Sequence, residues 1–176
     1  MLRPASRRPR SRRRKAGPDL RFEEKIRPPA GAAHWAAGLA RPLVFTNGVF
    51  DLLHRGHVTY LAQARELGAA LAVALNGDAS ARRLGKGAGR PLNVLEDRMA
   101  IVAALASVDA VTWFDEDTPA ALIELLRPEV LAKGGDWPVQ KIVGAKETLA
   151  RGGRVVSIPF EHRRSSSALL EKLRKV

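Results

Sequence analysis

Short apolar segments that alternate with helix-forming segments constrain the fold of this chain more than any other feature of its 176 residues. Five segments carry few charges and have the length of buried strands: 43–46, 69–76, 109–114, 129–133 and 154–160. Helical patterns follow them, over 57–68, 93–108, 118–128, 139–153 and 165–175. Because strand–helix–strand crossovers make strands parallel and cover both sheet faces, the pattern predicts an α/β fold with a doubly wound, Rossmann-like, parallel five-stranded sheet.

Two of these helices carry recognisable start signals. Asn93 with Glu96 three residues later has the spacing of a capping box. Thr118 followed by Pro119 has the pattern of an N-cap residue and a first helical proline. We therefore expect one helix to begin at Asn93 and another at Thr118.

Positive charge is concentrated at the N-terminus. Residues 1–27 contain 11 Lys and Arg against 3 Asp and Glu, so they contribute +8 of the net charge of +12. A block of like charge repels itself, so we expect a disordered basic leader over 1–27, a short extension over 28–41 and one domain over 42–176. Short helices are expected near 21–26 and 31–42. The leader's role stays open between a solvated tail, an upstream start codon and an arm that attracts phosphate.

Several classes of protein are excluded by simple counts. No apolar stretch follows the basic run, so a secretory signal is not predicted. No segment reaches the run of about 18 apolar residues that a membrane helix needs. The chain contains no cysteine, which excludes disulfides and thiolate metal sites.

Residues suited to phosphate binding follow four of the predicted strands. They lie in "NGVFDLLHRGH", "NGDASARRLGKGAGRP", "KGGDW" and "EHRRSSS". The carboxyl ends of parallel strands meet at one edge of the sheet, where ligands of doubly wound folds bind. Loops rich in Gly, Lys, Arg, His and Ser at this edge predict a site for a phosphate-bearing ligand.

His54 and His57 are the most informative residues of these loops. We expect Gly56 to allow a tight turn and His57 to open the following helix, so that both imidazoles reach a phosphate at a helix N-terminus. Imidazole N–H groups can stabilise charge on phosphoryl oxygens in a transition state. The alternatives are structural histidines or a metal pair, but zinc would need a third ligand, which neither His34 nor His162 is placed to supply.

The H-x-G-H pattern of His54, Gly56 and His57 after the first strand resembles the nucleotidyltransferase superfamily that includes cytidylyltransferases, pantetheine-phosphate adenylyltransferase and class I aminoacyl-tRNA synthetases. "KGGDW" and the "GKGAGRP…EDR" run narrow the resemblance to D-glycero-β-D-manno-heptose 1-phosphate adenylyltransferases, over residues 42–174. The chain departs from that family at Val49, Trp137 and Ser165–Ser167, where Cys, Tyr and Ser-Thr-Thr are common. It resembles stand-alone members rather than those fused to a sugar kinase.

This resemblance implies a reaction in which AMP passes from ATP to the heptose 1-phosphate, giving ADP-heptose and pyrophosphate for lipopolysaccharide-core or surface-glycan synthesis. It implies cytoplasmic work, because ATP is there, and a Mg²⁺ ion bound mainly through ATP phosphates, with no protein metal ligand named. Members of the superfamily are commonly dimers, so a homodimer is a further expectation. A nucleic-acid or membrane partner is not expected.

The resemblance also implies site residues. The expected catalytic residues are His54, His57 and Arg98. The alternative for Arg98 is an exposed salt bridge with no role in catalysis. The expected nucleotide and phosphate ligands are Thr46, Asn47, Gly48, Val49, Phe50, Gly56, Lys133, Gly134, Asp136, Arg164, Ser165, Ser166 and Ser167. The expected substrate ligands are Asp51, Asn76, Asp78, Lys86 and Arg90, although Asp51 could instead only orient the histidine loop.

Three rival functions remain from the sequence. A cytidylyltransferase acting on glycerol 3-phosphate or a related alcohol phosphate would share H-x-G-H, but it would carry a different signature where "EHRRSSS" stands. A nucleic-acid-binding protein would use the basic leader, with strong salt dependence. A degenerate, non-catalytic relative is disfavoured by the intact His54, Gly56 and His57.

Overall fold

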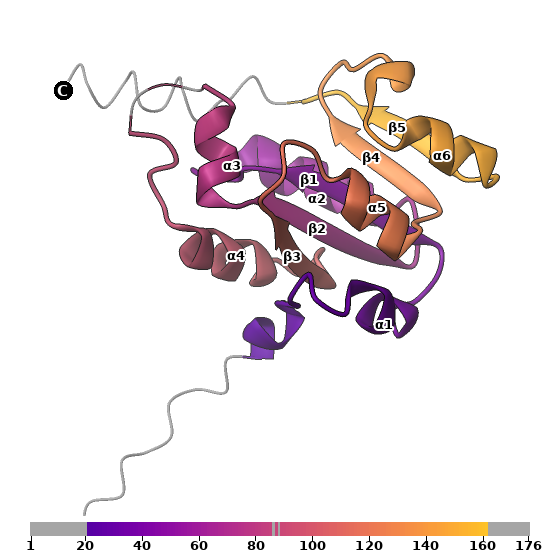
Figure 1. Cartoon of the computed structure of the whole chain (residues 1–176), viewed down its shortest axis with the longest axis horizontal. Helices are drawn as coiled ribbons and strands as arrows, with labels where there is room; N and C mark the ends of the chain where they lie inside the picture. Colours follow the sequence, from indigo (N-terminus) through magenta and orange to yellow (C-terminus); the bar gives the residue numbers. More distant parts are fainter. Residues whose placement is uncertain (1–20, 86, 88, 162–176) are drawn as a thin grey trace, which may run out of the picture.

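A parallel sheet forms the centre of the molecule. The computed structural model describes residues 21–85, 87 and 89–161. Within these ranges the chain forms a five-stranded sheet with all neighbours parallel, in the order β3-β2-β1-β4-β5 (Figure 1). The strands are β1 (Leu43–Gly48), β2 (Ala70–Asn76), β3 (Ala110–Phe114), β4 (Val130–Gly134) and β5 (Arg154–Ile158). The predicted doubly wound parallel sheet is confirmed, and its order reverses between β1 and β4.

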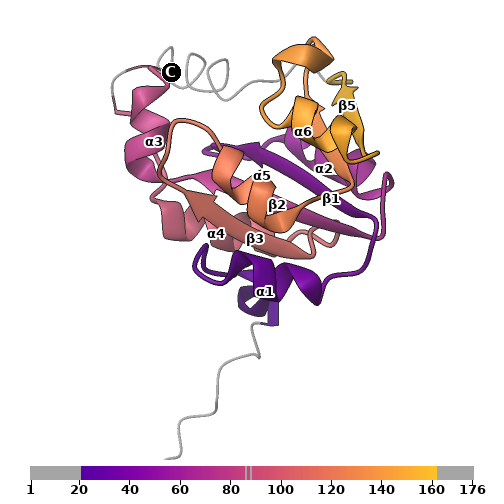
Figure 2. The ribbon, with the colours of Figure 1, turned by 45° about the vertical axis from the view of Figure 1, so that its right-hand side comes forward.

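Helices cover both faces of this sheet (Figure 2). The α-helices are α1 (Ala32–Ala37), α2 (Arg55–Arg65), α3 (Asp78–Arg83), α4 (Leu95–Ala103), α5 (Ala120–Leu126) and α6 (Ala145–Ala150). Two 3-10 helices are η1 (Arg21–Lys25) and η2 (Val139–Lys141). Side chains of α2 and α4 pack on one face, and side chains of α1 and α5 pack on the other. The helix expected over 165–175 lies outside the described residues.

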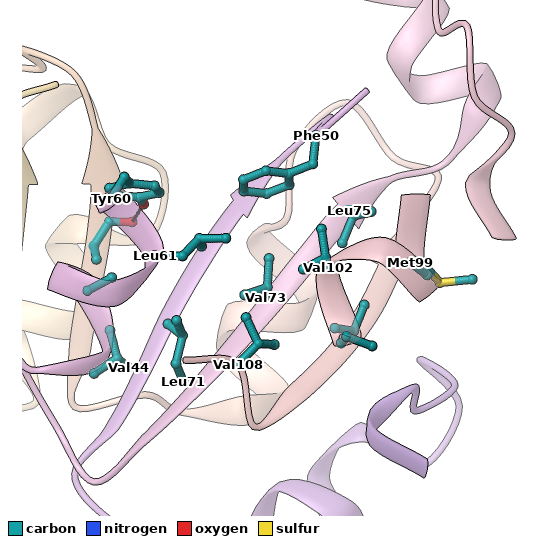
Figure 3. Close-up of a cluster of buried hydrophobic side chains, with 14 of the residues drawn as sticks. Val44, Phe50, Tyr60, Leu61, Leu71, Val73, Leu75, Met99, Val102 and Val108 are labelled. Atoms are coloured by element: carbon teal, nitrogen blue, oxygen red, sulfur yellow. Dashed lines mark hydrogen bonds between the residues drawn. The ribbon is translucent and has the colours of Figure 1, made fainter. Parts of the chain in front are cut away.

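The core is divided between the two faces because successive strand side chains point to opposite sides. Val44 and Val73 pack with Leu61 of α2 and Val102 of α4 on one face (Figure 3). Leu43 of the same β1 strand packs with the α1 and α5 side chains on the other. Both faces are buried, which explains why the central strands read as continuous apolar runs rather than alternating ones.

Three helix starts differ from the expected ones. Helix α2 begins at Arg55, with His54 as its N-cap residue, so Gly56 lies in the first helical turn rather than in a tight turn. Helix α4 begins at Leu95 because the Asn93 side chain donates to the Asp51 carbonyl, 2.7 Å away, instead of capping the helix. Helix α5 begins at Ala120, with Pro119 rather than Thr118 at the N-cap position.

Two segments differ in kind from the expectation. The helix expected over 139–153 is divided into η2 and α6, because Gly144 has a left-handed φ of 79° between them. A Cβ atom there would lie 2.8 Å from Ile123, so the break also allows close packing on α5. Helix α3 lies in a stretch read as a loop; its six residues carry no apolar periodicity, and polar contacts of Asp78 and Ser80 hold it in place.

Residues 21–27, the described end of the expected leader, are packed against the domain. Ile26 forms a parallel bridge with Val111 of β3, and the Arg27 amide donates to the Val111 carbonyl at 2.7 Å. Lys25 Nζ donates to the Leu105 carbonyl at 3.0 Å, and Phe22 packs against the core. The prediction from net charge over 1–27 did not take account of Phe22 and Ile26. These two apolar residues attach the segment to the domain, Ile26 at the outer strand β3 and Phe22 at the core.

Gly68 precedes β2 and packs directly against the backbone of Pro42. A Cβ atom there would lie 2.4 Å from the Pro42 carbonyl oxygen and 2.7 Å from Val44. We expect Gly68→Ala to lower the free energy of unfolding by about 1–3 kcal/mol in urea titrations, because the backbone must shift. Gly38→Ala is the matched control, since its Cβ would lie at an ordinary 3.5 Å from the Trp35 oxygen; equal losses in the two variants would contradict the packing argument.

Candidate active site

The carboxyl ends of β1 and β4 meet where the strand order reverses, which is where doubly wound sheets bind ligands. Lys133 at the end of β4 donates through Nζ to Asn47 Oδ1 at the end of β1, at 3.1 Å. A pocket of about 320 Å³ opens at this edge. The expected site residues that line it are Asn47, Gly48, Val49, Asn76 and Lys133.

The histidine pair lies at the start of α2, directly after the β1 loop. The rings of His54 and His57 stack, with centroids 3.9 Å apart and an interplanar angle of 19°. The His57 amide donates to the His54 carbonyl at 2.9 Å, which closes the first turn of the helix. Phe50 lies edge-on to His57, with centroids 5.4 Å apart, and has a φ of 50°, in the region that non-glycine residues seldom adopt. The expected approach of the two imidazoles at a helix N-terminus is therefore present.

Burial affects the His54 imidazole. Its Nδ1 atom is buried and makes no hydrogen bond to the residues that the structure describes. Burial also lowers the pKa of His54 below the ordinary 6.5, because a low-dielectric surrounding disfavours the charged ring. A neutral imidazole still donates one N–H, so the ring can hydrogen-bond an anion at this helix end.

Buried hydroxyls connect α2 to the sheet. The hydroxyls of Tyr60 and Thr46 share a short hydrogen bond, and Tyr60 also donates to the Ala132 carbonyl at 3.2 Å. Burial raises the pKa of Tyr60 far above its ordinary value, so this hydroxyl keeps its proton. Thr46 was expected to bind nucleotide, but its side chain is buried against Tyr60. Its hydroxyl joins β1 to the helix that carries the histidines.

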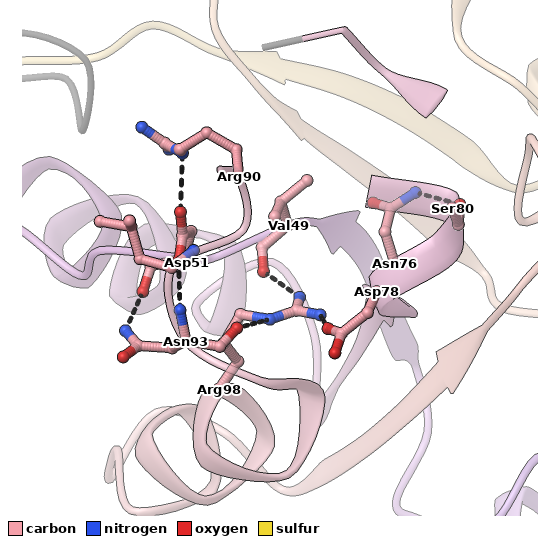
Figure 4. Close-up of polar contacts among 9 residues, drawn as sticks. Val49, Asp51, Asn76, Asp78, Ser80, Arg90, Asn93 and Arg98 are labelled. Atoms are coloured by element: carbon pink, nitrogen blue, oxygen red, sulfur yellow. Dashed lines mark hydrogen bonds and ion pairs between the residues drawn. The ribbon is translucent and has the colours of Figure 1, made fainter. Parts of the chain in front are cut away.

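Arg98 is fully buried, and its guanidinium points toward Val49 in the segment between β1 and α2 that leads to His54 (Figure 4). Its guanidinium donates to the Val49 carbonyl at 2.7 Å, to the Asn93 carbonyl at 3.0 Å and to Asp78 Oδ1 at 2.6 Å. The alternative in which Arg98 forms an exposed salt bridge is wrong, because the side chain is buried. The contacts favour a positioning role, in which Arg98 fixes the loop, over the direct phosphate contact expected from the sequence.

Asp51 and Arg90 pair with each other rather than facing the pocket. Their side chains form an ion pair at 2.8 Å, with 1% of Asp51 and 11% of Arg90 exposed (Figure 4). Asp51 Oδ1 also accepts from the Leu92 and Asn93 amides at 2.8 and 3.0 Å. These contacts match the alternative in which Asp51 orients the histidine loop.

The remaining expected residues fall into two groups. Gly134 is the last residue of β4, and a Cβ atom there would lie 2.8 Å from the Phe160 ring. Asp136 follows the strand and is exposed. Lys86, Arg164, Ser165, Ser166 and Ser167 lie outside the described residues.

Sequence reasoning missed several residues that line the pocket. Asp117 and Thr118 follow β3, and Trp137 follows β4, so the rule of loops after strand ends could have identified them. Lys141, Ile142 and Val143 also line it. They were hidden because the sequence pattern assigned them to the interior of a helix.

Two general properties complete the description. In the described ranges no group of three or more His, Asp or Glu side chains is placed to hold a metal ion. None of the helices in these ranges combines the length and apolar character that a membrane span requires.

The parallel sheet, the reversal of strand order at the pocket and the histidine pair on α2 define a nucleotidyltransferase, and the chain belongs to the cytidylyltransferase-like family, whose model matches residues 45–171. It is 57% identical over 157 residues to D-beta-D-heptose 1-phosphate adenylyltransferase of Bordetella bronchiseptica, covering 88% of this chain and 97% of that protein. Within the class, the chain therefore belongs to the heptose 1-phosphate adenylyltransferase family. The family resemblance stated from the sequence is confirmed.

Two further relatives agree with this placement. Bifunctional protein HldE of Hahella chejuensis is 51% identical over 133 residues, and the match spans 76% of this chain but only 28% of that protein. The crystal structure of the lipopolysaccharide core biosynthesis protein from Thermoplasma volcanium has a TM-score of 0.56 and 27% identity, covering 69% of this chain and 98% of that one.

Proposed function

We propose that this enzyme transfers AMP from ATP to D-glycero-β-D-manno-heptose 1-phosphate, releasing pyrophosphate and ADP-heptose. The observation that carries the proposal is the 57% identity over nearly the whole length of a D-beta-D-heptose 1-phosphate adenylyltransferase. The product would serve lipopolysaccharide-core or surface-glycan synthesis, in line with the name of the structural relative from Thermoplasma volcanium. The reaction would take place in the cytoplasm, where ATP is available.

The chemistry requires positioning more than proton transfer. The sugar phosphate is ionised at neutral pH, so one of its oxygens attacks the α-phosphorus of ATP without a protein base. A new P–O bond forms to the sugar phosphate as the bond from the α-phosphorus to the bridging oxygen breaks. Pyrophosphate leaves with the electron pair of the broken bond.

His54 and His57 would stabilise the charge that builds on the α-phosphate oxygens. Their stacked rings at the first turn of α2 support this role, because both lie where the helix dipole favours an anion. The backbone of Asn47 to Phe50 would lie along the nucleotide. Lys133, Gly134 and Asp136 would bind it from the end of β4, and Arg164 and Ser165–Ser167 would hold the outer phosphates.

Arg98, Asp51 and Arg90 would act on the loop rather than on the ligand. Arg98 fixes the Val49 carbonyl, and Asp51 ties the same loop to the amides of Leu92 and Asn93. A loop held from two sides keeps the nucleotide-binding backbone in one conformation before ATP arrives. Less binding energy is then lost in ordering the site.

Nucleotidyltransferases use a divalent cation with the nucleotide, and we infer Mg²⁺ here. Mg²⁺ usually keeps several waters and binds through substrate phosphates rather than an all-protein cage. The ion would neutralise charge on the departing pyrophosphate, and no described side chain is assigned as its ligand.

Pyrophosphate release by the purified full-length chain with Mg²⁺ tests the proposal. Heptose 1-phosphate and glycerol 3-phosphate are each supplied with ATP and with CTP. We expect release only with ATP and the heptose phosphate. Release with CTP and glycerol 3-phosphate would instead establish the alcohol-phosphate cytidylyltransferase alternative, and inactivity in all four pairings would refute the proposed reaction.

A further inference from the structure

The pocket at the switch point has two flanks that differ in chemistry. Asn76, at the end of β2, and Asp117 and Thr118, after β3, line one flank. Trp137, Ile142 and Val143, after β4, line the other. Since β3 and β4 are three strand spacings apart in the sheet order, the flanks lie about 14 Å apart at strand level.

The reaction itself requires the two substrates to occupy opposite flanks. The α-phosphorus is bonded to the nucleoside and attacked by the acceptor, so it must lie between them. His54 and His57 follow β1, which lies between β2 and β4 in the sheet. These histidines do not themselves line the pocket, but Asn47, Gly48 and Val49 of the preceding segment and Lys133 of β4 line it between the two flanks. The transferred phosphate therefore belongs in this middle part, with the nucleoside on one side and the acceptor on the other.

Polarity decides which substrate takes which flank. Trp137 and Val143 are 49% and 38% exposed, so a flat base could cover apolar surface there that water now contacts. The opposite flank offers an amide, a carboxylate and a hydroxyl, with Leu84 beside them. These groups are suited to the many hydroxyls of a sugar, which donate to carboxylates and accept from amides.

Hydrogen bonds hold the polar flank in a fixed arrangement. Asn76 Nδ2 donates to Ser80 Oγ at 3.0 Å (Figure 4). Ser80 Oγ in turn donates to the Glu116 carbonyl at 2.8 Å. Arg83 Nε donates to Asp117 Oδ1 at 2.6 Å, which orients that carboxylate from α3. These hydrogen bonds link the end of β2, helix α3 and the loop after β3. Polar groups that are held in fixed positions can discriminate between acceptors with different hydroxyl arrangements.

We propose that Asp117 and Thr118 bind the sugar hydroxyls of the acceptor and determine the enzyme's preference for a polyhydroxylated sugar phosphate, while the Trp137 flank takes the nucleoside. This inference rests on the proposed function, because it assumes a sugar-phosphate acceptor. It assigns to two residues of one loop a role in choosing the acceptor that is separate from the histidine chemistry.

Steady-state kinetics of pyrophosphate release, with each substrate varied in turn, test the assignment. Asp117→Asn and Thr118→Val should each raise KM for heptose 1-phosphate by about tenfold or more, as expected for a lost hydrogen bond in a binding site. KM for ATP should not change. Trp137→Ala should show the opposite split, with a raised KM for ATP and an unchanged KM for the acceptor. Both polar-flank variants should also lose selectivity for the heptose phosphate over glycerol 3-phosphate.

Two controls separate binding from indirect effects. Arg83→Met removes the donor that orients Asp117 but leaves the carboxylate in place, so it should raise the acceptor KM less than Asp117→Asn does. Equal effects of the two variants would mean that the carboxylate only anchors α3. Asp115→Asn changes the same kind of residue on the same loop, on the side that faces a separate groove, and should have no effect. If the wild type uses heptose phosphate but Asp117→Asn and Thr118→Val leave KM for the acceptor unchanged, the inference is overturned. The proposed function would then still stand.

Failure of the proposed function gives a different result. The wild-type chain would then release no pyrophosphate from ATP and heptose phosphate. ATP affinity measured by calorimetry would still report on the flanks, since Trp137→Ala should weaken it and Asp117→Asn should not. The reverse pattern would overturn the division of the pocket whatever the acceptor.

Discussion

Replacing either histidine at the start of α2 is expected to lower kcat for nucleotidyl transfer by about 100-fold to 1,000-fold, the usual loss when one preorganised donor to a developing oxyanion is removed. The variants are His54→Ala and His57→Ala. Because the two rings stack at 3.9 Å, the double variant should lose less than the product of the single losses. Initial rates of pyrophosphate release, with KM for both substrates, provide the measurement.

The matched control for this experiment is His34→Ala. His34 is exposed on α1, which precedes β1 and lies outside the site. It should leave kcat and both KM values unchanged. Thermal melts of all variants identify any loss caused by unfolding. Full activity in His54→Ala or His57→Ala, with melting as in wild type, would refute the transition-state role of that histidine.

Arg98→Met is expected to cause the largest loss of stability among single changes at the site, about 2–4 kcal/mol of unfolding free energy. The side chain is fully buried, and its removal leaves the Val49 and Asn93 carbonyls and the Asp78 carboxylate without this donor. Methionine fills a similar volume, so the lost hydrogen bonds rather than a cavity should dominate. Urea titration of both proteins measures the difference.

Arg83→Met offers a comparison of the same chemical change at an exposed pair. The Arg83 and Asp117 side chains are 48% and 81% exposed, so solvent screens their ion pair and the loss should stay below about 1 kcal/mol. A positioning role for Arg98 also predicts the result of Asp78→Asn. Asparagine keeps a hydrogen-bond acceptor for Arg98, so the variant should remain folded. It loses the negative charge that pairs with Arg98, so the loop should be held less firmly and KM for ATP should rise. Equal stability losses in the two arginine variants would contradict the role of burial.

The fold was predictable because its signals are local and repeated. The strands at β1, β2 and β4 are apolar runs with clear boundaries, and their alternation with helices implied parallel pairing. The histidine pair was predictable for the same reason, since His54 and His57 lie three residues apart on one short loop.

Contacts between distant segments were harder to predict. Nothing near Arg98 in the sequence indicates that it reaches Val49 and Asp78, 49 and 20 residues away. Asp117 and Thr118 were missed because the loop after β3 contains none of the Gly, Lys, Arg, His or Ser residues by which the other loops were selected, although its place after a strand end could have identified it. The split of the helix over 139–153 depends on the packing of Gly144 against Ile123, which is a tertiary contact.

The bridge between Ile26 and Val111 has a consequence for where the folding unit starts. An uncovered outer strand presents unpaired backbone groups to other molecules and invites intermolecular pairing. Residues 21–27 occupy part of that margin on β3, although the family model begins only at residue 45. The segment that covers this strand therefore lies outside the family model, whereas the match to the Bordetella bronchiseptica relative spans 88% of the chain and includes Ile26 and Arg27. The part of the chain that protects the sheet from intermolecular pairing is thus larger than the part that the family model defines.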